Sequence, residues 1–235
     1  MCIRDSFQIV QDCPTYVDCL GIPNGNAITD CEGNCKGTRL TGDINQDEER
    51  DLADVMDYIQ ESLDESVNIT DCKDLNDDGK INVWDTSLIL ECALHEGQAP
   101  QPGHGHSPCE FPFSITNPFD SVWLDISEVN STEGYVDILY KSPYGNMEGF
   151  QFELSGLTIS SVQSLVSGYN VSVFNDGTEM LGLSYEETGL SKTIEFVPFL
   201  RVFVDEFLTD TICFKSVEAL VNSNLEKMVL SLIHI

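Results

Sequence analysis

Basic residues are scarce in this sequence. Its 235 residues include 11 Lys and Arg against 40 Asp and Glu, which gives a net charge of −29. A surface this negative repels phosphate backbones and anionic lipid head groups, so we expect no nucleic-acid partner and no membrane binding through a basic patch. Three uses for the excess charge remain: cation binding, basic partners, or solubility outside the cell.

The sequence also lacks long apolar runs and catalytic signatures. No stretch approaches the ~18 apolar residues of a membrane span, and the first residues do not resemble a signal peptide. Only four His are present, and no nucleophile elbow, phosphate-binding Gly loop or His-Glu-x-x-His helix occurs. We therefore expect no enzyme activity in this chain, while a missing flanking catalytic domain stays an alternative.

Both ends of the chain have an unusual composition. Residues 1–6 (MCIRDS) and 230–235 (LSLIHI) resemble translated sequencing-adapter DNA at the edges of assembled environmental reads. We expect both segments to be non-native scars, and the sequence to be a metagenomic fragment of a longer protein. They are excluded from the predicted fold.

Cysteines are concentrated near the N-terminus. Nine are present, and eight remain when Cys2 is set aside, which favours a disulfide framework in a secreted or cell-surface protein. Residues 1–40 carry an irregular Cys/Gly-rich repeat of period 12, seen at 18–21 (DCLG) and 30–33 (DCEG). It resembles the short spacer repeats of secreted bacterial proteins. A zinc site at Cys31 and Cys35 stays open as an alternative.

Residues 74–85, here called loop 2, have the spacing of a calcium-binding loop. Oxygen-bearing side chains occupy positions 1, 3, 5, 9 and 12, namely Asp74, Asn76, Asp78, Asn82 and Asp85. Gly79 stands at position 6, where an EF-hand loop turns sharply, and Lys80 at position 7 would offer its backbone carbonyl. Position 12 is Asp where the EF-hand pattern has Glu. The spacing predicts a Ca²⁺ site.

Residues 43–54, here called loop 1, repeat the pattern 31 residues upstream. The same positions are Asp43, Asn45, Asp47, Asp51 and Asp54, and Glu49 at position 7 would offer its carbonyl. Glu48 stands where Gly is expected, and Arg50 where an apolar residue is expected. Because a residue with a Cβ pays about 1 kcal/mol or more in a left-handed conformation, we expect loop 1 to be the weaker of two Ca²⁺ sites.

Each loop runs into a segment with helical character. After loop 1, Val55, Met56, Ile59 and Leu63 form one apolar stripe, and residues 86–94 follow loop 2 with helix-forming composition. Two such loop and helix units over residues 41–96 resemble the type I dockerin module. The resemblance implies a small all-α module with two Ca²⁺ ions and an antiparallel helix pair.

The resemblance also implies a partner. A dockerin binds a cohesin domain through residues late in each loop, and the matching positions here are Leu52, Ala53, Val83 and Trp84. Trp84 is either such an anchor or part of the small core. Cys72 and Cys92 flank loop 2, and we expect them to form a disulfide.

The C-terminal half has β character. A Pro/Gly-rich linker at 97–108 is followed by short alternating runs at 122–126, 135–140, 147–154, 171–174, 180–184, 193–197 and 211–215. They predict an all-β antiparallel sandwich over 109–229. The strand Gly149–Gly156 (GFQFELSG) resembles cohesin-like and carbohydrate-binding-like sandwiches. Phe150 and Phe152 alternate with polar residues, so we expect them in the core.

These features predict a multidomain, secreted or surface-bound protein used for calcium-dependent assembly or attachment. Its expected partner is a protein of the cohesin or dockerin type, and a polysaccharide is the alternative partner. A second function, from a different class, is an accessory segment of a polysaccharide-degrading enzyme. A third is that the two modules bind each other within one chain.

Overall fold

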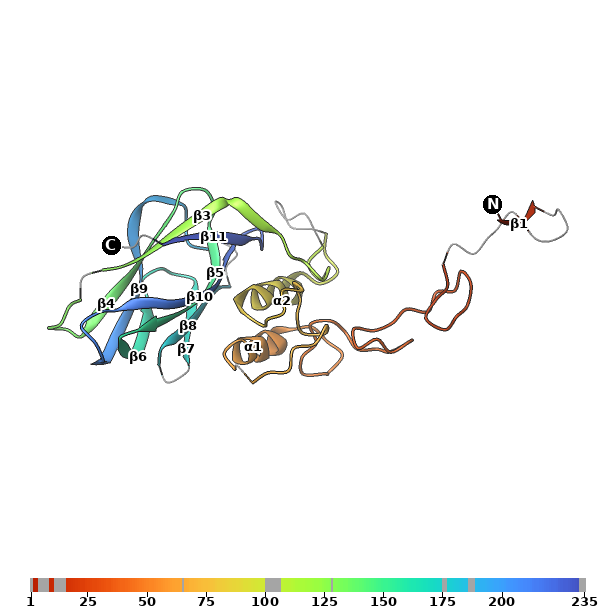
Figure 1. Cartoon of the computed structure of the whole chain (residues 1–235), viewed down its shortest axis with the longest axis horizontal. Helices are drawn as coiled ribbons and strands as arrows, with labels where there is room; N and C mark the ends of the chain where they lie inside the picture. Colours follow the sequence, from red (N-terminus) through yellow and green to blue (C-terminus); the bar gives the residue numbers. More distant parts are fainter. Residues whose placement is uncertain are drawn as a thin grey trace.

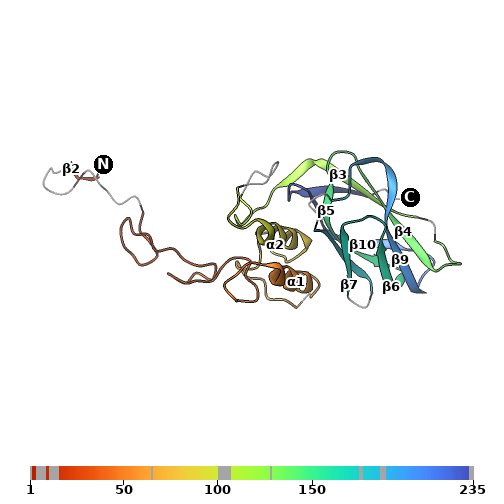
Figure 2. The same ribbon diagram turned by 180° about the vertical axis from the view of Figure 1, so that it is seen from behind.

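The computed structural model describes residues 2–3, 9–10, 16–64, 66–99, 107–127, 129–174, 177–185 and 189–232. Figure 1 shows, in chain order, an extended N-terminal arm (residues 16–40), the helical part, and a β structure. Figure 2 shows the same order from behind, with the helices between the arm and the strands. None of the described helices is long and apolar enough to cross a membrane.

The arm consists of two turns with the same hydrogen bonds. Short strands β1 (Cys2–Ile3) and β2 (Ile9–Val10) precede it. In the first turn the backbone N–H of Gly21 donates to the carbonyl of Asp18, and in the second Gly33 donates to Asp30. The matching glycines have φ of 78° and 81°, which residues with a Cβ rarely adopt. The repeat of period 12 is therefore structural.

Two helices follow the loops, as predicted. Helix α1 spans Leu52–Glu61 and α2 spans Val83–His95. Each begins at position 10 of its loop, because position 9 is the N-cap: the side chains of Asp51 and Asn82 accept hydrogen bonds from the backbone N–H two residues on. The prediction for Met56 was wrong, since its side chain is 59% exposed. Tyr58, which the predicted stripe omitted, is fully buried in its place.

The β structure is a nine-stranded sheet. Its strands are β3 (Thr116–Ile126), β4 (Tyr135–Ser142), β5 (Met147–Ser155), β6 (Leu157–Ser164), β7 (Tyr169–Phe174), β8 (Glu179–Ser184), β9 (Thr193–Phe207), β10 (Cys213–Asn222) and β11 (Lys227–Leu232). The order across the sheet is β6-β9-β4-β3-β11-β10-β5-β8-β7. The two edge strands β6 and β7 contact each other, so the sheet is nearly closed on itself.

The sheet wraps around one apolar core. The inward side chains of β3, β4, β6 and β9 meet those of β5, β7, β8 and β10 in a single buried cluster. Phe150 and Phe152 lie fully buried in it with their rings stacked 5.2 Å apart, which confirms the predicted core role. The alternation of apolar and polar residues along each strand is what turns one face of the sheet inward.

The sheet differs from the prediction in three respects. The prediction of a purely antiparallel sheet was wrong, because β11 pairs with β3 in parallel. The exclusion of residues 230–235 from the fold was also wrong for Leu230–Leu232, which form the end of β11 and pair with residues 122–124. Strand β6 was missed because only Gly156 separates it from β5.

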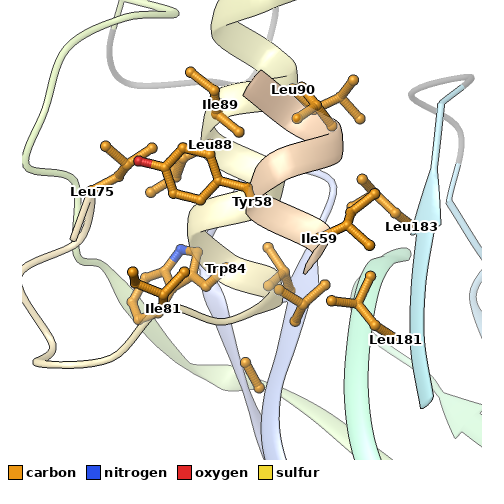
Figure 3. Close-up of a cluster of buried hydrophobic side chains, with 14 of the residues drawn as sticks. Tyr58, Ile59, Leu75, Ile81, Trp84, Leu88, Ile89, Leu90, Leu181 and Leu183 are labelled. Carbon is orange, nitrogen blue, oxygen red and sulfur yellow. The ribbon is translucent and has the colours of Figure 1, made fainter. Parts of the chain in front are cut away.

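The helices share a second core with the sheet, so no separate all-α module is evident. Tyr58, Ile59, Trp84 and Leu88 from the helices pack with Leu183 of β8 and other outward residues of the sheet in one buried cluster. Figure 3 shows these side chains pointing toward one another from α1, α2 and the strands.

The predicted disulfide between Cys72 and Cys92 was wrong. Cys72 bonds to Cys31 of the arm, and Cys92 bonds to Cys109. The reason lies in the entry to loop 1: the N–H of Gly42 donates to the carbonyl of Cys72, which places Cys72 at the base of the arm.

The remaining described cysteines answer two further expectations. Cys19 bonds to Cys35, so Cys31 and Cys35 belong to different disulfides and the zinc alternative was wrong. Cys213 is free and exposed. Three disulfides among the described residues fit an oxidising, extracellular setting.

Candidate functional site

The two predicted calcium loops have the same hydrogen-bond pattern. The carboxylate at position 12 accepts from the backbone N–H of position 2: Asp54 from Ile44 at 2.9 Å in loop 1, and Asp85 from Leu75 at 2.8 Å in loop 2. The other oxygen at position 12 accepts from the N–H of position 9 in both loops. Loops 1 and 2, which differ in sequence, are thus closed by the same two hydrogen bonds to the carboxylate at position 12.

The first carboxylate of each loop is held by backbone N–H groups of the same loop, three in loop 1 and two in loop 2. Asp43 accepts from the N–H groups of positions 4, 5 and 6, and Asp74 from those of positions 5 and 6. At position 6 these donors are Glu48 at 3.1 Å and Gly79 at 2.8 Å. This contact requires a left-handed backbone, and both residues have it, with φ of 72° and 80°. The predicted conformation of Glu48 is confirmed; for a residue with a Cβ, such a conformation generally costs about 1–2 kcal/mol relative to a right-handed one.

The loops differ in how closely their carboxylates approach. In loop 1 one oxygen from each of Asp43, Asp47 and Asp54 lies within 4.8 Å of the others. Among the described His, Cys, Asp and Glu residues this is the only trio so placed, so the carboxylates of loop 2 lie further apart. The donor sets are carboxylates, amides and carbonyls, the hard oxygen ligands that Ca²⁺ prefers, so the residues present fit the ion.

Burial makes these carboxylates costly without a cation. Asp54 and Asp85 are fully buried. Burial, with the nearby carboxylates of Asp78 and Asp74, raises the pKa of Asp85 to about 8, and burial also raises the pKa of Asp54. A bound cation would favour the charged form of both carboxylates and so oppose this effect of burial.

Arg50 shows how loop 1 tolerates a charged residue at position 8. In loop 2 this position is Ile81, which is buried in the shared core. The stem of Arg50 lies beside Gly42, and its guanidinium forms an ion pair with Glu96 just after α2. The charge therefore reaches the edge of the helix pair, while the stem takes the apolar place.

The helix pair sits on the outward side chains of β8, β5 and β10, here called the covered face. Gly149 of β5 is the closest point: a Cβ built there would lie 2.9 Å from the Ser87 hydroxyl and 3.0 Å from a methyl group of Val83. Only glycine lets α2 approach this strand so closely, since interior glycines of strands often mark such contacts.

Gln151, two residues further along β5, connects both helices to the sheet. Its side-chain carbonyl accepts from the N–H of Val83 at 2.9 Å, and its amide donates to the carbonyl of Ser62 at 3.0 Å. These groups lie at the start of α2 and the end of α1, where helices leave backbone groups unpaired. The amide also donates to Glu179 at 2.9 Å. Gln151 is 1% exposed, and its two bonds to the helices are buried, whereas its bond to Glu179 is partly buried.

Trp84 is the apolar anchor of this interface. Its ring is 3% exposed, and its indole N–H donates to the carbonyl of Leu225, between β10 and β11, at 2.7 Å. The Lys227 ammonium lies 5.8 Å from the ring centre. At the rim, Lys80 forms an ion pair with Glu218 of β10. The sequence left open whether Trp84 is an exposed anchor for a partner or part of the core. The structure shows that it is buried, against the sheet of its own chain.

The four predicted partner-binding residues therefore fall into two groups, one buried and one exposed. Val83 and Trp84 are buried on the covered face, whereas Leu52 is 51% exposed and Ala53 is exposed. Sequence reasoning missed Gly149 and Gln151 as interface residues. A signal for them existed in the sequence. Gly149 and Gln151 alternate with the inward-facing Phe150 and Phe152, so the outward face of this strand carries a glycine and a glutamine, which is unusual.

Comparisons with known proteins give only distant similarities. No protein-family model matches the chain, and no curated protein matches it. Solved structures similar to it include a chain of a type I cohesin–dockerin complex, Coh-OlpA-Doc918, from Clostridium thermocellum, with 13% identity, a TM-score of 0.37, and coverage of 48% of this chain and 95% of that one.

Two further solved structures have similar values. CaCohA2 from Clostridium acetobutylicum has 12% identity, a TM-score of 0.36, and coverage of 48% of this chain and 86% of its own. A protein from Nocardia farcinica with an immunoglobulin-like fold has 14% identity, a TM-score of 0.29, and coverage of 40% and 72%. The neighbours thus include cohesin modules, in agreement with the sequence resemblance, at TM-scores that carry no further argument.

Proposed function

We propose that this chain is a calcium-binding docking protein of extracellular assemblies. The helix pair with its two loops, residues 41–96, is here called the hairpin and acts as a dockerin-like module. The sheet acts as a cohesin-like receptor whose covered face is filled by the hairpin of the same chain. The observation that carries the proposal is the seating of α2 on β5 through Gly149 and Gln151.

Calcium has a defined task in this proposal. Between residues 41 and 96 there are seventeen Asp and Glu against three Lys and Arg, so the hairpin is strongly self-repelling. Loop 1 would hold the ion with the side chains of Asp43, Asn45, Asp47, Asp51 and Asp54 and the carbonyl of Glu49. Loop 2 would use Asp74, Asn76, Asp78, Asn82, Asp85 and the carbonyl of Lys80. Each ion offsets two negative charges at the start of a helix.

The two halves of the hairpin have different roles. The late positions of loop 2 contact the covered face, so they hold the hairpin on its own sheet. The late positions of loop 1, Leu52 and Ala53, face solvent beside the exposed Met56. Exposed apolar side chains on a helix surface favour a protein partner. We assign the external partner, a protein with a sheet face of the cohesin type, to this side.

Calcium titration of the full chain tests the proposal. After removal of divalent ions with EDTA, calorimetry should count two Ca²⁺ per chain, and saturation should raise the melting temperature. At a free Ca²⁺ concentration of 100 times its Kd, one bound ion adds about 2.7 kcal/mol to the free energy of unfolding. The matched control is Mg²⁺ at the same concentration, which prefers a smaller octahedral site. An unchanged melting temperature in EDTA would contradict the proposal.

The docking part needs its own measurement. Hydrogen exchange of α2 amides should be slow in the native chain and fast in Gly149→Val, because the added side chain collides with Ser87 and Val83. Ser161→Val, at an exposed position of β6, is the matched control. If α2 exchanges equally fast in the native chain, the hairpin is not docked and the proposal fails.

A further inference from the structure

The connection between the hairpin and the sheet is shortened by a disulfide. Helix α2 ends at His95 and β3 begins at Thr116, so residues 96–115 join the two parts. The Cys92–Cys109 bond fixes the far side of this connection to α2, with the two Cα atoms 4.7 Å apart. The segment that can separate the hairpin from the sheet is therefore residues 110–115.

Even this short segment is held at both ends. The N–H of Phe113 donates to the carbonyl of Leu75 in loop 2 at 2.9 Å, and the ring of Phe113 is buried in the shared core. The carbonyl of Ile115 accepts from the N–H of Lys227 in β11 at 2.8 Å. One residue, Ser114, lies between the part bound to the hairpin and the part bound to the sheet.

We propose that the Cys92–Cys109 disulfide is a clasp that reserves the covered face for the hairpin of the same chain. Without the clasp, the covered face accepts the hairpin of a second copy, and the two chains exchange hairpins. This inference rests on the proposed docking of hairpin and sheet. It adds that the Cys92–Cys109 disulfide, next to the segment that joins the hairpin to the sheet, prevents the hairpin from docking on another copy.

Chain length limits how far the hairpin can move from its own sheet. A fully extended chain spans at most about 3.3–3.6 Å per residue, so six residues reach about 20 Å and twenty residues about 70 Å. Helix α2 alone, with thirteen residues, is about 20 Å long. A clasped hairpin stays within about 20 Å of its own sheet, whereas an unclasped hairpin ranges over about 70 Å and therefore has much wider access to a neighbouring molecule.

The clasp also affects the equilibrium between docking within one chain and exchange of hairpins between two chains. The effective concentration of a tethered partner falls with roughly the −3/2 power of tether length, which is about sixfold between six and twenty residues. Exchange between unclasped chains should therefore appear at high protein concentration and reverse on dilution. It should require the same contacts at Gly149 and Gln151 that hold the hairpin within one chain.

Two variants test the clasp by independent routes. Cys92→Ser with Cys109→Ser removes the bond, and a twenty-residue Gly/Ser insertion after the exposed Ser114 keeps the bond but lengthens the tether. The native chain should sediment as a monomer up to about 1 mM, the high end of tethered effective concentrations. Both variants should form dimers in a concentration-dependent manner. Adding Gly149→Val to either variant should abolish the dimers.

Each outcome has one meaning. If the insertion variant stays monomeric at the highest concentration while its α2 amides remain protected from exchange, the clasp proposal is overturned and the docking proposal survives. If dimers persist with Gly149→Val, they use another surface, and the clasp proposal is again overturned. Unprotected α2 amides in the native chain itself would instead overturn the docking on which the clasp depends.

Discussion

The substitution Glu48→Gly tests the physical account of loop 1 directly. Glu48 has a φ of 72° at the position where loop 2 has Gly79, at 80°. A residue with a Cβ pays about 1–2 kcal/mol for this conformation, whereas glycine adopts it freely. Glycine also costs about 0.5–1 kcal/mol, because it has more conformational freedom to lose on folding. The net expectation is a gain of about 0.5–1 kcal/mol in the free energy of unfolding.

The matched control is Glu49→Gly, one residue further along. It removes the same charge from the same exposed loop, but Glu49 has no left-handed φ to relieve. This variant should lose about 0.5–1 kcal/mol, so the two variants should differ by about 1–2 kcal/mol. The reciprocal change Gly79→Glu in loop 2 should lose about 0.5–1 kcal/mol by the same reasoning.

Urea denaturation of the full chain, followed by circular dichroism in EDTA, measures the difference. The m-values of the two variants should agree, so that a shift in midpoint reports stability alone. If Glu48→Gly is no more stable than Glu49→Gly, position 6 of loop 1 is not strained. Loop 1 would then have no strain at position 6 that could make it the weaker calcium site.

Three further substitutions extend the test. Asp74→Ala should weaken calcium binding more than Asp43→Ala, since we expect loop 2 to be the stronger site; equal losses in calorimetric titration would refute the ranking. Gln151→Leu leaves buried backbone groups unpaired and should cost about 1–3 kcal/mol in a urea melt, whereas the exposed control Gln163→Leu should cost little. Trp84→Phe leaves one carbonyl without its donor and should lower stability by about 1–2 kcal/mol; an unchanged melt would show that this bond contributes nothing.

Local spacing predicted the loops and helices well, because the hydrogen bonds that close each loop and cap each helix join residues at most ten apart. Asp85 reaches the N–H of Leu75 inside one loop, and Asn82 caps the helix that follows it. The start of each helix was predicted a few residues late, since the N-cap lies inside the loop motif. Whether the loops hold calcium is a separate matter, and it stays a prediction.

Contacts between distant segments could not be predicted from spacing. The partners of Cys72 and Cys92 depend on where the arm and the linker pass, and no local pattern encodes those paths. The same holds for the parallel pairing of β11 with β3, which joins residues more than a hundred positions apart. Met56 was misplaced for a related reason: an isolated helix has an apolar stripe, but the sheet determines which side of it is covered.

Calcium loop and docking surface occupy consecutive residues, which has a consequence for how the protein works. Asn82 is a proposed ion ligand and also the N-cap of α2. The backbone N–H of the next residue, Val83, donates to Gln151 of the sheet. The side chain of Trp84, which follows, is buried against the covered face. An ion that orders loop 2 therefore orders the contact residues in the same step. By thermodynamic reciprocity, docking must raise calcium affinity by the factor through which calcium strengthens docking. In loop 1 the matching residues, Leu52 and Ala53, are exposed, so under the proposed function this half of the hairpin is the one that would couple calcium binding to an external partner.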